Sequence, residues 1–290
     1  MKKVLLLLFV AIGLAAQAQK VSNKLSFQKG QKLEMMTESK GTVSMELMGQ
    51  PMENTFSSSV TRTFDVANVA NGQATIEHKV KRIQFSAEAM GQSQSFDSEK
   101  EADMKSDMGK NMEKALKNKY TMTVDAKGKV TAVKPDDDNP NKDSADEDDP
   151  MAGMLQQFGA DLELPKVGDA TSFKVLPDKE LSKGESWVDS TQKSPDIKGK
   201  TTYTVSSITD SDVVVDFVQD AKMQRTQDAM GTEANIAMDL KVTGKITLDR
   251  KTGLLKQRTA NTEAKGAIEA GGQSLPMSTK GTETVTVKAM

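Results

Sequence analysis

The fold class of this chain is decided by the stretch MDLKVTGKITLD, residues 238–249. Every second residue from Met238 to Leu248 is apolar or glycine, and the residues between them are polar or charged. Successive side chains of a strand point to opposite faces, so this alternation predicts a long strand with one face buried and one face in water. Antiparallel sheets allow such one-sided burial, and the stretch therefore indicates an antiparallel sheet.

The same alternation recurs along most of the chain. It is present in the runs Val43, Met45 and Leu47; Phe56, Val60, Phe64 and Val66; Val213, Val215 and Phe217; and Val285, Val287 and Ala289. Within the run from Gln73, Ile76 and Val80 share one phase, whereas the apolar residues from Ile83 onward take the other. One inserted residue moves all later side chains of a strand to the opposite face, so this change predicts a β-bulge.

Short turn sequences separate these runs and predict hairpins. Asn71-Gly72, Lys127-Gly128 and Thr252-Gly253 are typical of tight connections between two strands. Four further tips resemble one another, and they are Met48-Gly49-Gln50, Met90-Gly91-Gln92, Met230-Gly231-Thr232 and Gly271-Gly272-Gln273.

Parts of the chain resemble each other and indicate an internal repeat. The sequence FQKGQKL at residues 27–33 is similar to LSKGESW at residues 181–187. We therefore predict two related β halves, at residues 19–134 and 181–290, joined by an acidic linker at 135–150 and a short helix with its connection at 151–180. The alternative is that long hairpins look alike without any duplication.

Two helices are expected between these strands. Ser98-x-x-Glu101 matches a capping box, and methionines recur every four residues after it, which predicts one helix over residues 98–118. A second, shorter helix is expected to start at Asp149 and Pro150 and to end at Gly159. Both are expected to pack on the buried face of a sheet. Their apolar stripes supply the residues that we predict to line an apolar ligand-binding groove: Met104, Met108, Met112, Met151, Met154, Leu155 and Phe158.

These patterns together predict a mainly β protein. Its long antiparallel strands form two related curved sheets or half-barrels, and one or two short helices pack on the buried face. Aromatic residues are only 4% of the chain, whereas there are 18 methionines, so methionine must fill part of the interior.

The overall composition excludes several classes of partner and chemistry. Lys and Arg number 39 and Asp and Glu number 41, and this balance argues against binding to nucleic acid. The chain has no cysteine, which excludes disulfides, cysteine-bound zinc and thiol catalysis. The single histidine, His78, shares the inward phase of Ile76 and Val80, so we expect it to be packed in the interior and not to act as a base. No nucleophile elbow, phosphate-binding loop or zinc-protease motif is present, so no catalytic residue is predicted.

Two features leave a metal site as an alternative. The acidic run between Pro135 and Pro150 is interpreted as a solvated linker, although its carboxylates also suit Ca²⁺. The methionine clusters are interpreted as core or as a pliable apolar groove, although thioethers also suit Cu(I). No cofactor and no metal ligand is predicted.

The N-terminus has the pattern of an export signal. Lys2 and Lys3 precede an apolar run, and Ala16-Gln17-Ala18 gives the small residues that signal peptidase accepts. We expect a signal peptide over residues 1–18, cleavage after Ala18 and a location in the periplasm or outside the cell. A buried N-terminal helix is the alternative. No later segment approaches the ~20 apolar residues of a membrane helix.

Several short motifs carry a resemblance to known proteins. They are the Ala16 to Gln19 cleavage region, the opening Leu25-Ser26-Phe27-Gln28-Lys29-Gly30, the Met-Gly-Gln tips, and Val167-Gly168-Asp169 before Lys183-Gly184-Glu185-Ser186-Trp187. In these the chain resembles a family of uncharacterised exported proteins of Gram-negative bacteria. Its outline is similar to that of bacterial lipoprotein carriers, whose open β-barrel curves around helices and encloses an apolar cavity. The resemblance implies no catalytic residue.

The expected function is that of an exported, non-catalytic envelope protein. We expect it to bind an apolar ligand, such as a lipid or a lipidated partner, in the interior of the curved sheet. The alternatives are a structural or protein-interaction module without a small ligand, and a metal-binding protein.

Overall fold

A computed structural model describes residues 20–47, 50–89, 91–140, 164–194, 196–229 and 232–290. The first half of the chain forms β2 (Lys32–Leu47), β3 (Gln50–Ala70), β4 (Gln73–Ala89), β5 (Gln92–Asp97), β6 (Lys119–Asp125) and β7 (Val130–Pro135). The second half forms β9 (Ser186–Ser194), β10 (Ile197–Ile208), β11 (Asp212–Ala229), β12 (Thr232–Asp249), β13 (Leu255–Ala270) and β14 (Gln273–Ala289). Two further short strands, β1 (Lys20–Val21) and β8 (Leu181–Ser182), pair with each other.

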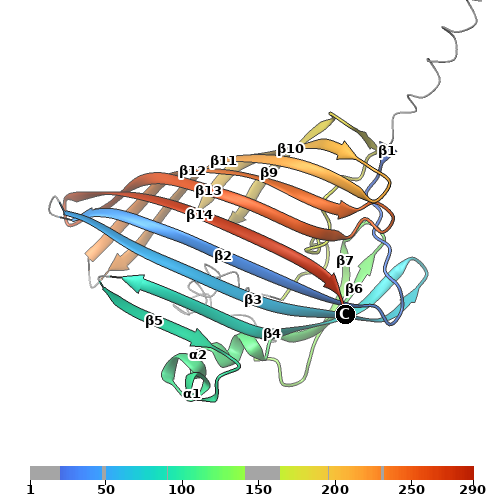
Figure 1. The fold of residues 1–290 in the computed structure, drawn as a ribbon, viewed down its shortest axis with the longest axis horizontal. Helices are drawn as coiled ribbons and strands as arrows, with labels where there is room; N and C mark the ends of the chain where they lie inside the picture. The colour runs from blue at the N-terminus through green and yellow to red at the C-terminus, as the bar shows by residue number, and fades with distance from the viewer. Residues whose placement is uncertain (1–19, 48–49, 90, 141–163, 195, 230–231) are drawn as a thin grey trace, which may run out of the picture.

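These long strands form one curved antiparallel sheet of 12 strands (Figure 1). The order is β7-β6-β4-β3-β2-β14-β13-β12-β11-β10-β9, and β5 pairs with β4. The two halves meet where β14 pairs with β2. Within the described ranges β7 and β9 end the strand order and the sheet is not closed. The prediction of a mainly β fold with long antiparallel strands is therefore confirmed.

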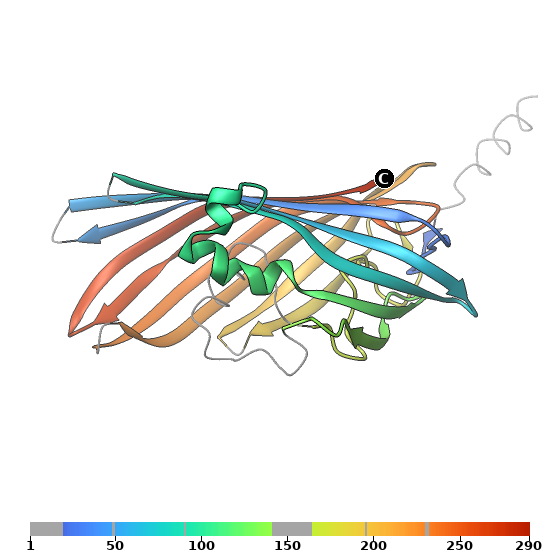
Figure 2. The same cartoon turned by 90° about the horizontal axis from the view of Figure 1, so that it is seen from below.

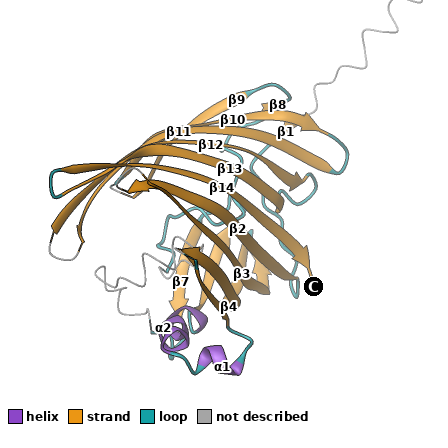
Figure 3. Cartoon of the chain, turned by 60° about the vertical axis from the view of Figure 1, so that its left-hand side comes forward, coloured by secondary structure: helices purple, strands orange, loops and turns teal. Residues whose placement is uncertain are grey.

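The alternation in the stretch at residues 238–249 fixes which face of β12 is buried. Met238, Ile246 and Leu248 are buried, whereas Asp239, Lys241 and Lys245 on the other face are exposed. The inward side chains of the other long strands continue this face, and the sheet curves around it (Figure 3). We call it the concave face.

The predicted bulge lies in β4. Thr61 pairs with Arg82 and Arg62 with Val80, so Lys81 is the extra residue. It places both His78 and Ile83 on the concave face despite their opposite phases in the sequence. Without the extra residue, the apolar side chains after Val80 would point into water.

Hairpin turns form where glycine was predicted to allow them. Asn71 and Gly72 have φ of 51° and 75°, the left-handed values that a two-residue turn between strands requires at both positions. Gly271 and Gly272 have φ of 58° and 79°. The remaining tips at residues 48–49, 90 and 230–231 lie wholly or partly outside the described residues.

The helical region differs from the prediction of one helix starting at a capping box. It consists of α1 (Glu101–Met104) and α2 (Asp107–Leu116). The Ser98 hydroxyl accepts a hydrogen bond from the Ile83 amide at 3.0 Å, so it caps no helix. Ser106 caps α2 instead by accepting from the Gly109 amide at 3.1 Å. The capping-box prediction is therefore wrong, because a tertiary contact to β4 takes the serine.

The methionine stripe of these helices packs as expected on the buried face. Met112 is completely buried against Val60, Ile83 and Phe85 of β3 and β4. Figure 2 shows α2 on the concave side of these strands. The second predicted helix, with Asp149, Pro150 and Gly159, lies outside the described residues. Among the residues that are described, no helix is long and apolar enough to cross a membrane.

Two connecting segments fill one end of the concave face, which we call the closed end. Phe173, from the connection at residues 164–180, is completely buried, and its ring lies 5.6 Å from that of Phe27 and 5.0 Å from that of Phe64. The segment at residues 20–28 joins turns of both halves. The Leu25 amide donates to the Ala126 carbonyl at 2.7 Å, and the Ser26 amide donates to the Thr252 carbonyl at 2.8 Å.

The two sequences that indicated a repeat make equivalent contacts. The Gly30 amide donates to the Val66 carbonyl at 2.8 Å, and the Gly184 amide donates to the Val205 carbonyl at 2.7 Å. Both glycines have positive φ, at 81° and 87°. The duplication itself and the proposed boundaries of the halves stay predictions.

Candidate functional site

The concave face carries a row of methionines toward the end opposite the closed end. Strand register places Met52, Met45, Met277, Gly266, Met238, Met223 and Ile197 opposite one another on successive strands from β3 to β10. We call these residues the methionine row. Seven neighbouring strands span about 29 Å at ~4.8 Å per strand. The row therefore forms one continuous apolar band across the trough.

The methionine row lies on the face that is buried elsewhere in the sheet. Met45 has the same parity as Leu33 and Met35 of the core, and the β2–β3 and β14–β2 pairings contain no register shift. Most side chains of the row are only partly buried, and Met238, at 6% exposed, is the buried exception. An apolar surface on the inside of a curved sheet is thus still partly accessible.

A second feature lies near the closed end. A hollow of about 490 Å³ is bounded by β2, β3, β4, β6, β13, β14 and the connection at residues 164–172. Its polar lining includes Arg62, His78, Tyr120, Thr171, Arg258 and Glu283, and its apolar lining includes Met35, Phe64, Met122, Leu255 and Val285. We call it the polar hollow.

His78 is a group of the polar hollow whose pKa lies far from its ordinary value. It is 6% exposed, and its ring is stacked on Tyr120 with the centroids 4.4 Å apart. Burial, and then the positive charge of Arg62, lower its pKa to about 3, while a hydrogen bond to the Asn118 backbone acts in the opposite direction. The imidazole is therefore neutral at physiological pH, and its Nδ1 atom has no hydrogen-bond partner. The prediction that His78 is a packed interior residue is confirmed.

Charged side chains form another wall of the polar hollow. The Arg258 guanidinium pairs with the Glu283 carboxylate from the neighbouring strand. Its carbon also lies 5.0 Å from the centroid of the Phe217 ring, within the range of a cation–π contact. Thr171 is 8% exposed, and its hydroxyl oxygen has no partner.

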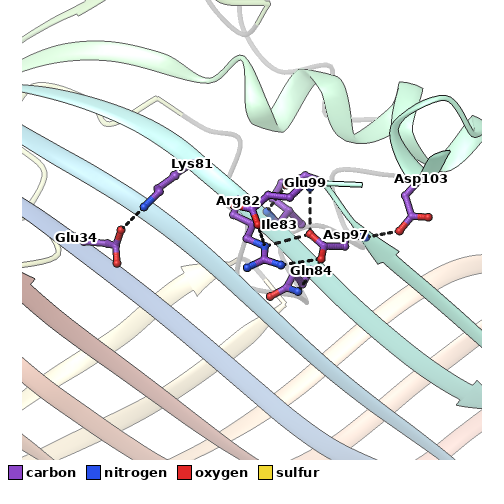
Figure 4. A network of polar contacts seen from close by, with 9 residues as sticks. Glu34, Lys81, Arg82, Ile83, Gln84, Asp97, Glu99 and Asp103 are labelled. Atoms are coloured by element: carbon purple, nitrogen blue, oxygen red, sulfur yellow. Dashed lines mark hydrogen bonds and ion pairs between the residues drawn. The ribbon is translucent and has the colours of Figure 1, made fainter. Parts of the chain in front are cut away.

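A polar network holds the two helices against the sheet (Figure 4). Arg82 of β4 donates from Nε and Nη2 to the two carboxylate oxygens of Asp97 at 3.1 and 2.7 Å. Asp97 also accepts from Gln84 at 3.0 Å and from the Glu99 amide at 3.1 Å. The hydrogen bonds from Arg82, stronger than the opposing effect of burial, lower the pKa of Asp97 to about 2. The network fixes the start of α1 relative to β4, so its role is positional.

The predicted groove residues are only partly described. Met104, Met108 and Met112 pack with the core under α2 and do not line the polar hollow. Met151, Met154, Leu155 and Phe158 lie outside the described residues, so their role stays a prediction. The sequence patterns did not predict Met223, Met238 and Met277 as site residues, because only strand register places them in one row.

Hard or borderline metal ions, such as Ca²⁺ or Zn²⁺, need several carboxylate or imidazole ligands close together. Within the described ranges, no group of three or more His, Asp or Glu side chains lies close enough together to hold one. Most of the acidic run, from Asp143 to Asp149, is outside those ranges.

A model of a protein family matches residues 71–255 of the chain. It is described as a family of unknown function, DUF6263. No curated protein sequence matches the chain.

Solved structures with a similar arrangement of strands have low sequence identity to the chain. One, titled for lipid–protein interactions in lipovitellin, is 10% identical with a TM-score of 0.48, and the match covers 91% of this chain and 25% of that one. The COG4313 outer membrane channel from Pseudomonas putida F1 is 9% identical with a TM-score of 0.26, over 92% and 98% of the two chains. The present chain thus spans about a quarter of the lipovitellin chain it matches.

Proposed function

This chain belongs to the family of unknown function DUF6263, and from its geometry we propose that it is an exported, non-catalytic protein that binds a lipid-like amphiphile on the concave face of its sheet. The observation that supports this proposal is the methionine row, a continuous and partly accessible apolar band on the inside of the trough.

The dimensions of the trough suit a lipid chain. The hydrocarbon core of a bilayer is ~30 Å thick, so one acyl chain extends over about 15 Å. The methionine row is about 29 Å long at ~4.8 Å per strand, which is enough for a whole chain. A ligand that lies along the row would remove its partly exposed thioether side chains from water.

Methionine also suits a ligand of variable shape. Its unbranched side chain has three rotatable bonds and a polarisable sulfur, so a methionine surface adapts to chains that differ in length or unsaturation. A row built of Leu or Ile would favour one shape. The signal-peptide pattern at residues 1–18 supports a location outside the cytoplasm, where such a protein would carry or hold envelope lipids.

The test measures binding of N-phenylnaphthylamine, an uncharged dye that fluoresces in apolar sites. We expect the wild-type chain to bind it and the double variant Met45→Gln, Met277→Gln to bind about tenfold more weakly, because two thioethers facing the dye become polar amides. The matched control is Met36→Gln, because Met36 is a partly buried methionine on the opposite face of β2.

Two results would contradict the proposal. One is an unchanged affinity for the dye in the double variant, and the other is an equal loss in Met36→Gln. If the dye binds as expected, mass spectrometry of organic extracts from protein purified out of its native host would identify the natural ligand. An extract that contains no lipid, together with no binding of the dye, favours a structural or protein-interaction module.

A further inference from the structure

We infer that the polar hollow binds the hydroxyl group of the amphiphile, which donates a hydrogen bond to Nδ1 of His78. This inference rests on the proposed function and names the head group that the ligand carries. The charges and the unpaired atoms of the hollow favour a hydroxyl as this head group.

His78 is set up as a hydrogen-bond acceptor. Its contact with the Asn118 backbone and its neutral state leave Nδ1 as the ring atom with a free lone pair. An unpaired acceptor that is buried is destabilising, because folding removed it from water without providing a replacement. A donor from a ligand would remove that cost, so the unpaired atom favours binding.

The charges nearby decide which donor fits. Ammonium groups and hydroxyl groups both donate hydrogen bonds, but Arg62 lies close enough to His78 to lower its pKa. Arg258 lines the same hollow, although Glu283 neutralises it. Asp169 also lines the hollow but is exposed, so it contributes little inside. A second cation next to Arg62 would be repelled, whereas a neutral hydroxyl is not.

The lining of the hollow contains a second unpaired group. Thr171 comes from the connection at residues 164–180 and not from the sheet, and its hydroxyl oxygen is buried without a partner. A hydroxyl both donates and accepts, so it matches in kind both the acceptor of His78 and the hydroxyl of Thr171. The lining mixes polar and apolar residues, and its volume of about 490 Å³ lies in the range of sites for small molecules.

The position of the hollow along the trough is compatible with an attached chain. Thr37 of the hollow and Met45 of the methionine row are eight residues apart on β2, or about 26 Å at ~3.3 Å per residue. Between them, Gly41 of β2 pairs with Gly281 of β14, and the ring of Phe56 from β3 lies over Gly41. An amphiphile that occupies both the hollow and the row must therefore be longer than a single acyl chain of about 15 Å.

The experiment compares the direct binding of decanol with that of its isomer methyl nonyl ether, measured by isothermal titration calorimetry. The two probes have the same atoms and differ in whether the oxygen carries a hydrogen. We expect the wild-type chain to prefer decanol by about tenfold, the effect of one buried hydrogen bond whose acceptor is otherwise unpaired. In His78→Phe, which keeps the ring stack on Tyr120 but removes the acceptor, the two probes should bind equally. In Thr171→Val both probes should bind more weakly, because each has an oxygen that accepts from the Thr171 hydroxyl, while the preference for decanol remains.

The control is Tyr203→Phe, which removes a polar atom from the concave face outside the polar hollow and should leave the preference unchanged. Thermal unfolding of each variant shows whether it is folded. Equal binding of both probes to the wild-type chain would overturn the hydroxyl site but leave lipid binding intact. A full preference that persists in folded His78→Phe would also overturn it. Binding of neither probe would overturn this inference, and the proposed function fails as well only if the dye also does not bind.

Discussion

At the scale of single residues, His78 makes stability depend on pH. Its pKa is about 3 in the folded chain, against an ordinary value of 6.5. Between these values the unfolded chain binds the proton and the folded chain does not, so stability rises with pH across this window. The contribution is complete above about pH 6.5 and is lost as the pH falls. Lowering the pH from about 7 to about 5 should therefore cost about 2 kcal/mol of unfolding free energy.

Urea denaturation at a series of pH values measures this effect. The variant His78→Phe should show a much flatter profile between about pH 7 and about pH 5, where few carboxylates titrate. Parallel profiles for the wild-type chain and the variant would mean that His78 is solvated or paired in the folded protein. That result would also weaken its assignment as an acceptor for a ligand.

At the scale of structural elements, the Arg82–Asp97 pair determines how the helices attach to β4. We expect Asp97→Asn to lower the unfolding free energy by about 1–3 kcal/mol, since the two charge-assisted contacts to Arg82 lose their charge on one side. In the wild-type chain this contribution should be present above the ordinary Asp pKa of 3.8 and be lost as the pH falls toward about 2. Urea denaturation at neutral and acidic pH measures both effects.

The control for this pair is Glu101→Gln. The Glu101–Lys105 ion pair of the same helical region is largely exposed, with side chains 82% and 74% accessible. Such a pair contributes little, at most about 0.5 kcal/mol. If both substitutions cost the same, the network at Asp97 is only a surface feature and does not hold the helices.

Most elements of the fold follow from local patterns in the sequence, and so does part of the site. The two-residue tip after Leu47 fixes the pairing of Leu47 with Gln50, and the pairing of Met45 with Met52 follows by counting. The same count from Ala229 and Thr232 gives Met223 opposite Met238. Turn sequence therefore determines these two pairs of the methionine row, although the alternation alone did not reveal them.

The alignment of these pairs with one another and the polar hollow depend on contacts that no local pattern encodes. Met45 meets Met277 only because β2 pairs with β14 from the far end of the chain. Thr171 reaches the hollow on a connection without repetitive structure. The capping-box prediction failed for the same reason, because Ser98 binds the Ile83 amide of a strand that precedes it.

At the scale of the whole molecule, the β2–β14 pairing decides whether the halves are separate units. The main core contains side chains from both halves and from the connections at residues 20–28 and 164–181. A core shared in this way is expected to unfold in one cooperative transition, although the sequence also allowed two independent domains. The pairing of β2 with β14 is therefore the place to test cooperativity.

Thr284→Pro disrupts the pairing of β2 with β14 near its middle. Thr284 pairs with Glu38 on one side and with Thr259 on the other, so proline removes a backbone donor from a central strand. We expect a loss of at least about 2 kcal/mol of unfolding free energy, with Thr284→Ala as the control for the side chain. Hydrogen exchange in urea should show β4 of the first half and β12 of the second losing protection at the same, lowered concentration. If only one of the two strands responds, the halves fold independently, and the trough is an interface between two domains rather than the interior of one.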